Sequence, residues 1–376
     1  MSEDQSSTDA ADTDTYALKA VALPDIEAPD VPYRPPMPKT YRPRIGMIGT
    51  GGISASHLDA YRTAGWEVAA LWNRTRSKAE DKSVQYCPNA RIEDDWKALL
   101  ADPDIDVIDI TLHPEHRAPV IRAALEAGKH VLSQKPFVTD LDLGEDLVKL
   151  AQDKGVKLAV NQNGRWAPHK AFMREVVRAG LIGDVLSAHI CLHWNHGWTA
   201  GTPFDEIEDL VLYDFGVHWF DFIASLVGER AQSVFATAVH AEGQANKVPL
   251  LAQAMIRLEG GQASLVFDGG IPHGPRDTSF IGGTLGSLQS DGPDLGVQSV
   301  TMTTPQGIAR PALEGNWFND GFQGTMGELL CAIEEDREPS NGARENLQSL
   351  AMAFAAVESR MTGTEVSIGS VRKLPS

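Results

Sequence analysis

Cysteine is scarce in this sequence, and long apolar runs are missing. The 376 residues include only 3 cysteines (Cys87, Cys191 and Cys331), and these lie far apart. Such usage excludes a disulfide framework and favours a reducing, cytoplasmic location. We find no run of about 18 apolar residues, so no transmembrane helix is expected. The first residues are acidic and lack the apolar stretch of a secretory signal peptide.

Positive charge is also in short supply. The chain has 33 basic and 51 acidic side chains, which give a formal net charge of −18. Nucleic acids and anionic membrane surfaces both require concentrated lysine and arginine, so neither is an expected partner. Hydrophobic residues make up 42% of the chain, as is usual for a soluble globular protein, and the length suggests two domains.

Residues 1–43 form an acidic N-terminal extension. Several prolines between Pro24 and Pro38 favour an extended course. Two interpretations stay open: a disordered solubilising tail, or an arm that lies along a neighbouring subunit. The second is supported by an apolar patch of Tyr16, Leu18, Val21 and Leu23.

Short apolar runs alternate with helix-like segments in the first half of the chain. The runs lie at 45–49, 68–72, 107–110, 130–133 and 157–160. Strands that alternate with helices predict an α/β fold, here a doubly wound parallel sheet of the Rossmann type over residues 44–163.

The second half is patterned differently. One helix is expected after Pro168 and another over 209–227, and strand-like runs with glycine-rich turns follow. This order predicts, for residues 164–376, an α+β domain with a mainly antiparallel open sheet that serves substrate binding and oligomerisation. The helices expected at the C-terminal end can pack back on the first domain.

A glycine-rich turn follows the first predicted strand and opens a helix. It consists of Gly49, Thr50, Gly51, Gly52 and Ile53. In this context the turn is the dinucleotide fingerprint, because glycine lets the backbone approach a pyrophosphate at a helix N-terminus. Ser54 stands where the fingerprint has Gly or Ala.

The end of the second predicted strand should read the ribose of the dinucleotide. Asn73, Arg74 and Arg76 stand there, without the carboxylate that would repel a 2′-phosphate. The sequence therefore favours an NAD(P) site that leans to NADP, and a solvated basic turn is the alternative.

Two further segments carry candidate catalytic groups. Lys135 follows the predicted strand at 130–133, so it should point into the crevice at the carboxyl edge of the sheet. Asp214, His218 and Asp221 are spaced i, i+4, i+7 and should share one helix face. A histidine flanked by carboxylates is suited to proton transfer.

The chain resembles the Gfo/Idh/MocA oxidoreductase family, the group of glucose–fructose oxidoreductase and inositol dehydrogenase, from residue 44 to about 365. The resemblance rests on IGMIGTGGIS, DPDIDVIDIT, ALEAGKHVLSQKP, NQNGRWAP, GLIGDVL and DFGVHWFD, in this order. It implies an NAD(P)-binding domain, an open-sheet substrate domain, and oxidation or reduction of a secondary alcohol on a sugar or cyclitol.

The resemblance also assigns residues. The family's Glu-Lys-Pro lysine falls on Lys135, and its Asp-x-x-x-His pair falls on Asp214 and His218. Two departures concern the cofactor site. Gln134 replaces the glutamate before the lysine, and the usual histidine after the fourth strand is replaced in a segment that contains His113, Glu115, His116 and Arg117.

The segment 189–198 is rich in histidine and tryptophan. His189, Cys191 and His193 would share one face of a strand, which suits zinc, but no second ligand cluster follows and no metal is expected. His193, Asn195, His196 and Trp198 are instead candidates for the wall of a polyol pocket, against the alternative that the tryptophans only pack the sheet. Arg165 and Trp166 are further candidate cleft residues.

These patterns predict an NAD(P)-dependent oxidoreductase that transfers a hydride between a nicotinamide and a secondary alcohol of a sugar, cyclitol or glycoside. A homo-oligomer, dimer or tetramer, is expected. One alternative is a glycoside-cleaving or eliminating enzyme that oxidises its substrate transiently and retains the cofactor. A non-catalytic nucleotide sensor is the other, and Lys135, Asp214 and His218 together argue against it.

Overall fold

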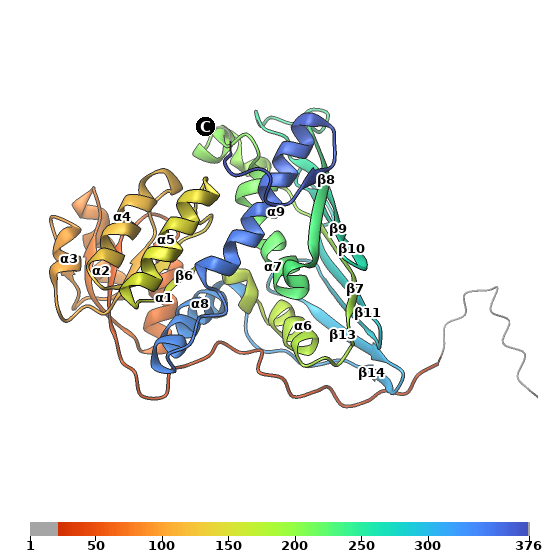
Figure 1. The fold of residues 1–376 in the computed structure, drawn as a ribbon, viewed down its shortest axis with the longest axis horizontal. Coiled ribbons are helices and arrows are strands. Elements are labelled where there is room, and N and C mark those ends of the chain that lie inside the picture. Colours follow the sequence, from red (N-terminus) through yellow and green to blue (C-terminus); the bar gives the residue numbers. More distant parts are fainter. Residues whose placement is uncertain (1–21, 375–376) are drawn as a thin grey trace, which may run out of the picture.

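Six parallel strands form the sheet of the first domain (Figure 1). The structure, a computed structural model, describes residues 22–374. The sheet order is β3-β2-β1-β4-β5-β6, and every neighbouring pair is parallel. The strands are β1 (Arg44–Ile48), β2 (Glu67–Trp72), β3 (Arg91–Ile92), β4 (Val107–Ile110), β5 (His130–Ser133) and β6 (Leu158–Val160). The predicted Rossmann arrangement is confirmed, and only β3, which has two residues and no apolar run, was not expected.

Helices alternate with these strands and cover the sheet (Figure 1). They are α1 (Ser54–Ala64), α2 (Arg76–Tyr86), α3 (Lys97–Ala101), α4 (Pro114–Glu126) and α5 (Leu141–Lys154). The strand order reverses between β1 and β4, so a crevice for a ligand opens beyond their carboxyl ends.

The second domain contains a nine-stranded sheet of order β14-β13-β12-β11-β7-β10-β9-β8-β15. Only β7 and β10 are paired in parallel, so the predicted mainly antiparallel sheet is confirmed. The strands are β7 (Val185–His193), β8 (Ala231–Val239), β9 (Leu251–Leu258), β10 (Gly261–Asp268), β11 (Arg276–Gly283), β12 (Ser287–Gly292), β13 (Ser299–Thr304), β14 (Gly307–Ala309) and β15 (Val366–Ser367).

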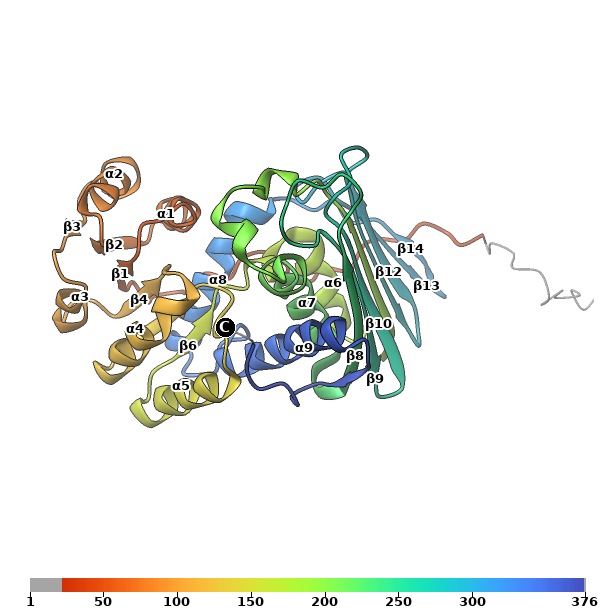
Figure 2. The same ribbon diagram turned by 90° about the horizontal axis from the view of Figure 1, so that it is seen from above.

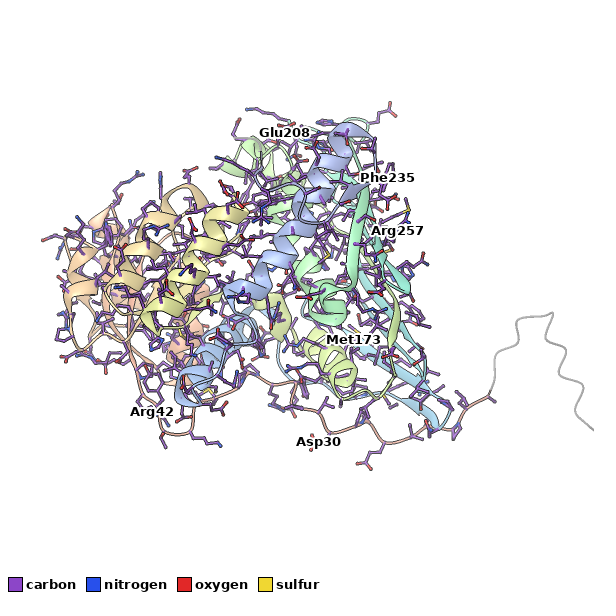
Figure 3. The ribbon with its side chains drawn as sticks, in the orientation of Figure 1. Asp30, Arg42, Met173, Glu208, Phe235 and Arg257 are labelled. Atoms are coloured by element: carbon purple, nitrogen blue, oxygen red, sulfur yellow. The ribbon has the colours of Figure 1, made fainter. Side chains whose placement is uncertain are left out.

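Helices cover one face of this sheet and leave the other bare. Figure 2 shows α6 (Pro168–Arg178), α7 (Val217–Val227) and α9 (Ala343–Thr362) on the side that faces the first domain. Phe235 and Arg257 point away from the helices on the outer side (Figure 3). Exposed apolar side chains on the strands, such as Met255, are consistent with an interface, and the homo-oligomer stays a prediction.

The helix expected over 209–227 is interrupted. Leu210–Asp214 forms a π-helical turn, η4, and α7 begins only at Val217. By length and composition the segment Leu210–Arg230 could cross a membrane, which the sequence reading overlooked. However, 78% of its apolar window is buried inside the domain, where Phe220 and Ile223 are fully enclosed. The segment is therefore part of the core of the second domain.

Four short 3-10 turns complete the architecture. They are η1 (Asn163–Trp166), η2 (Gly197–Thr199), η3 (Pro203–Glu206) and η5 (Gly228–Arg230). The first of them connects the two domains.

The helix α8 (Trp317–Glu334) belongs in space to the first domain. Its Phe322 and Met326 share a buried core with Ile45, Leu58 and Tyr61 of β1 and α1. The expectation that C-terminal helices pack back is met, so a boundary at residue 163 describes the sequence order but not the core.

Residues 22–43 lie along their own chain as an extended strap (Figure 1). Asp25 bridges to Ile308 of β14, and the Tyr33 ring packs edge-on against Phe172 of α6, with 6.3 Å between the ring centroids. For these residues the structure contradicts the free tail, and the arm on a neighbouring subunit stays a prediction. Leu23 is half-buried, and Tyr16, Leu18 and Val21 lie outside the described residues.

At its C-terminal end the strap is hydrogen-bonded to the last turn of α8. The carboxylate of Glu334 accepts hydrogen bonds from the backbone N–H groups of Lys39 (2.7 Å), Thr40 (2.6 Å) and Tyr41 (2.9 Å), and from the Thr40 hydroxyl (2.6 Å). These donors hold the pKa of Glu334 at about 2.

Glu334→Ala should lower the melting temperature at pH 7, because four donors lose their acceptor. The folded-state pKa is depressed, so the contribution is present above the unfolded value and lost as pH falls toward 2. The difference from wild type should therefore shrink in acid. Glu335→Ala is the matched control, since Glu335 bonds only Arg337. Equal melting curves for the two variants would contradict an anchoring role.

Candidate active site

Lys135 lies in the loop after β5, at the edge of the sheet where the strand order predicts a crevice. The loop is held by Arg117 of α4, whose guanidinium is 1% exposed. It donates hydrogen bonds to the carbonyl oxygens of Leu112, Gln134, Lys135 and Pro136. Burial lowers the pKa of Arg117 to about 10. This cation therefore joins the loops after β4 and β5.

The Lys135 side chain crosses to the second domain. Its Nζ lies 2.8 Å from the backbone oxygen and 3.3 Å from the Oδ2 atom of Asp214 in η4. The two side chains are 15% and 13% exposed. The structure thus brings together the predicted lysine and aspartate from opposite domains, and Asp214 pairs with Lys135 rather than with His218.

His218 stands near the start of α7, beside this pair. His218 is half-buried, and its Nδ1 atom is buried without a hydrogen-bond partner among the described residues. Burial and the positive charges of Lys135 and Lys170 lower the pKa of His218 well below its usual value. The imidazole is therefore neutral at pH 7 and able to accept a proton.

Two tryptophans frame His218. The imidazole is perpendicular to the rings of Trp219 and Trp317, with centroid distances of 6.1 and 5.7 Å. Trp317 Nε1 donates to Asn163 Oδ1 at 3.0 Å. A Cβ atom at Gly164 would lie 3.1 Å from Trp317 Cζ2 and 3.7 Å from His218 Nδ1, so this glycine leaves room for both rings.

Gln134 ends a buried hydrogen-bonded network. Its Oε1 accepts from the Lys135 backbone N–H (2.7 Å) and from Asn161 Nδ2 (3.0 Å). Asn161 Nδ2 also lies 3.1 Å from His57 Nε2, and His57 Nδ1 lies 2.8 Å from Asp109 Oδ2. The network connects α1 and β4 with the crevice loop. Because Oε1 takes both donors, Nε2 is the Gln134 atom left for a ligand.

The glycine turn fits a dinucleotide. Gly49 has a φ of 101°, and Cβ atoms at Gly51 and Gly52 would meet nothing within 4 Å, so the backbone is open to a close ligand. Ile53 is the N-cap of α1 and supplies no side-chain cap, and the Thr50 hydroxyl is buried without a partner among the described residues. The first three amides of α1 donate to carbonyl oxygens of the turn itself, so it is the open glycine backbone at the positive end of the helix that suits a pyrophosphate.

The candidate ribose residues are not equivalent. Asn73 supports the glycine turn, because its Oδ1 accepts from Thr50 N at 3.1 Å. Arg76 pairs with Glu80 (2.8 Å) and Asp94 (2.5 Å), whereas Arg74 is exposed. His113, the N-cap of α4, is also exposed and makes no side-chain cap. Arg74 is therefore the guanidinium available to a 2′-phosphate.

Three residues that the sequence placed at the site make buried contacts in the interior instead. Arg165 is 4% exposed and binds Asp221 through two bonds of 2.6 and 2.9 Å. Asp221 also accepts from Ser349 and does not join Asp214 and His218. Trp166 is 3% exposed and packs under Arg174. The predictions of Arg165 and Trp166 as cleft residues, and of Asp221 as a flanking carboxylate, are wrong for this reason.

The residues considered for zinc have other partners. His189 lies 2.8 Å from Ser264 Oγ, and His193 Nδ1 lies 2.7 Å from Asp268 Oδ2. Within residues 22–374 no group of three His, Cys, Asp or Glu side chains could hold a metal ion.

The other candidates for a polyol pocket lie in an aromatic cluster. His196 is 8% exposed, packs against Phe215 and Phe267, and has its pKa lowered to about 4 by burial. Its ring is therefore an interior one, contrary to the prediction. Asn195 is exposed and accepts from Gly197 N, and Trp198 is 59% exposed. Of the four candidates, His193, Asn195 and Trp198 remain accessible.

Comparisons with known proteins agree with this arrangement. Residues 43–162 match the model of the oxidoreductase family with an NAD-binding Rossmann fold, and residues 171–289 match the GFO/IDH/MocA C-terminal domain. The chain belongs to the Gfo/Idh/MocA oxidoreductase family.

Individual relatives are distant but cover nearly the whole chain. Inositol 2-dehydrogenase of Rhizobium meliloti is 26% identical over 86% of this chain and 99% of its own. D-apiose dehydrogenase of Paraburkholderia graminis is 25% identical over 86% and 89%. An Agrobacterium radiobacter oxidoreductase, solved with NAD+, L-tartaric acid and magnesium, superposes with a TM-score of 0.79 at 20% identity over 88% and 99%.

Several residues around this site were not identified from the sequence as site residues. Arg117, Asn161, Gly164, Lys170, Trp219 and Trp317 all surround it. Gly164 lies in the NQNGRWAP motif, which offered a signal, whereas the burial of Arg117 and Lys170 left none.

Gly164→Ala should lower kcat by about tenfold with little change in melting temperature, because the added methyl displaces the Trp317 ring that frames His218 by a few tenths of an ångström and small misplacements are costly. Steady-state rates and thermal melts check this. Gly296→Ala, where the nearest atom is a side-chain oxygen at 3.4 Å, is the control. A Gly164→Ala variant with the kcat of the control would show that the rings have room to spare.

Proposed function

We propose that this protein is an NAD(P)-dependent dehydrogenase or reductase that acts on a secondary alcohol of a sugar, cyclitol or glycoside. The observation that supports it most is the meeting of Lys135 from the cofactor domain with Asp214 and His218 from the substrate domain. A cation and a neutral imidazole beside a dinucleotide crevice are the groups that alcohol oxidation requires. The relatives named above act on inositol, a cyclitol, and on D-apiose, a sugar.

The residues divide the chemistry between them. A nicotinamide bound in the crevice would supply the hydride acceptor for oxidation of the carbinol carbon, or the hydride donor for the reverse reaction. His218 Nε2 takes the hydroxyl proton as the C–O bond becomes a carbonyl. Lys135 Nζ stabilises the negative charge that develops on the oxygen, and Asp214 holds both Lys135 and a neighbouring hydroxyl.

The accessible polar groups define the substrate side. His193, paired with Asp268, and Asn195 can exchange hydrogen bonds with hydroxyls, and the exposed Trp198 can stack on the apolar face of a sugar ring.

His218→Ala and Lys135→Ala should each lower kcat by about 10²–10⁴-fold, because each removes a group that acts on the reacting hydroxyl. Cofactor affinity should change little. The double variant should lose less than the product of the single losses, since both act on one proton transfer. Lys149→Ala, which removes a lysine paired only with Asp153 on the surface of α5, is the control.

The pH profile tests the same assignment. Because the pKa of His218 is lowered, kcat/KM for oxidation should rise with pH in a limb below pH 6.5, and this limb should disappear in His218→Ala. Near-normal turnover of His218→Ala would overturn the assignment. Product that forms without net reduction of the nicotinamide would instead support transient oxidation with a retained cofactor.

We further propose that NADP binds at least as well as NAD. No carboxylate stands at Asn73 or Arg74, and Arg74 is free of ion pairs among the described residues. Arg74→Ala should weaken NADP more than NAD in equilibrium titrations. Arg76→Ala, which removes a guanidinium already paired with two carboxylates, should change the ratio less. A tenfold preference of wild type for NAD, about 1.4 kcal/mol, would contradict the proposal.

A further inference from the structure

A lysine is sealed inside the second domain. Lys170 lies on α6, its side chain is 0% exposed, and its Nζ has no hydrogen-bond partner among the described residues. Lysine is almost never buried in this way without a partner, because an unpaired ammonium loses its hydration. The proposed mechanism does not use this residue.

The ammonium lies against aromatic faces instead. Nζ is 4.2 Å from the ring centroid of Trp317, 4.7 Å from that of Trp219 and 5.7 Å from that of Phe222. Cation–π attraction to indole is strongest in desolvated sites such as this one. Lys170 therefore fixes two rings that come from α7 and α8.

The same two indoles are the neighbours of His218. The imidazole meets Trp219 at 89° and Trp317 at 89°. Lys170 and His218 thus contact a shared pair of rings.

We propose that Lys170 is a positioning residue for His218: its ammonium fixes the Trp219 and Trp317 rings that frame the imidazole. This inference rests on the proposed function, in which neutral His218 accepts the hydroxyl proton.

The charges around His218 are consistent with this role. Lys135 and Lys170 both act to lower its pKa, the first from the crevice loop and the second from α6. Asp214 faces Lys135, and Asp221 on α7 is turned to Arg165. From the sheet, His193 of β7 is paired with Asp268 of β10. On α6, His169 next to Lys170 is neutral, because burial lowers its pKa, and Arg174 faces Trp166.

Asp277 of β11 keeps Lys170 charged. Its carboxylate is 0% exposed and has no hydrogen-bond partner among the described residues. Burial lowers the pKa of Lys170 to about 8, and the charges of Asp277 and Asp221 oppose this shift. Lys170 therefore stays mostly protonated at pH 7.

Titration of His218 by NMR, in protein labelled with ¹⁵N-histidine, tests the proposal without turnover. Lys170→Met removes the charge but keeps the length of the side chain, so the midpoint of His218 should rise by about one pH unit. Lys170→Arg keeps the charge and should leave the midpoint near that of wild type. The acid limb of kcat/KM should move to higher pH with the same variants.

Lys129→Met is the matched control. Lys129 is also buried, but its Nζ donates to the Asp102 and Ile105 carbonyl oxygens in the first domain. It should leave the His218 midpoint unchanged. Should Lys170→Met not fold, Lys170→Gln makes the same test with an amide that can bond Asp277.

An unchanged His218 midpoint in a folded Lys170→Met or Lys170→Gln variant would overturn the proposal and leave Lys170 as a packing residue. This outcome is separate from failure of the proposed function, because the midpoint is measured on the protein alone. A shifted midpoint in a protein with no dehydrogenase activity would retain the electrostatic link and reject the chemistry.

Discussion

The ion pair between Lys135 and Asp214 requires the two domains to stay at one separation. Its 3.3 Å contact joins the loop after β5 to the turn before α7. Both side chains are largely shielded from water, and charges attract each other more strongly when water does not screen them. The packing of α8 on α1 contributes to this constraint, because α8 follows the second sheet in the chain yet lies in the core of the first domain. The strap adds a second tie, from β14 to the last turn of α8.

Inside the first domain the same lysine is positioned by polar groups that would be costly to bury alone. Asn161 bonds Gln134, His57 and Thr325, so one amide connects the crevice loop with α1 and α8. Arg117 donates hydrogen bonds to carbonyl oxygens of both crevice loops and has no carboxylate partner among the described residues. When every polar group of a buried network is hydrogen-bonded, any shift would leave one of them unpaired. The network therefore holds the crevice loop in a single geometry. A change at Gln134 would therefore alter both the cofactor environment and the Lys135 backbone.

The sequence predicted the elements whose signal is local, and missed those set by distant contacts. The strand at 107–110 was located to the residue, because three of its four buried residues are apolar, as is usual for a strand of a parallel sheet. Asp221 was misplaced because its spacing from Asp214 assumed one continuous helix, whereas η4 and α7 are separate and Asp221 faces Arg165. No pattern near Lys170 indicates burial, since a lysine on a helix is normally exposed.

Lys170 and Asp277, two buried ionisable groups without hydrogen-bond partners among the described residues, are costly at neutral pH. Burial raises the pKa of Asp277 to about 6 and lowers that of Lys170 to about 8, so between these values both are charged in surroundings that disfavour either charge. These shifts make the free energy of unfolding depend on pH. The contribution of Asp277, whose pKa is raised, is lost as pH rises through 6, and that of Lys170, whose pKa is lowered, is lost as pH falls through 8. Two apolar side chains would remove both losses, and buried pairs are often replaced in this way without harm. A charge retained at such a cost, in contact with the rings around His218, is expected where it serves the reaction rather than the fold.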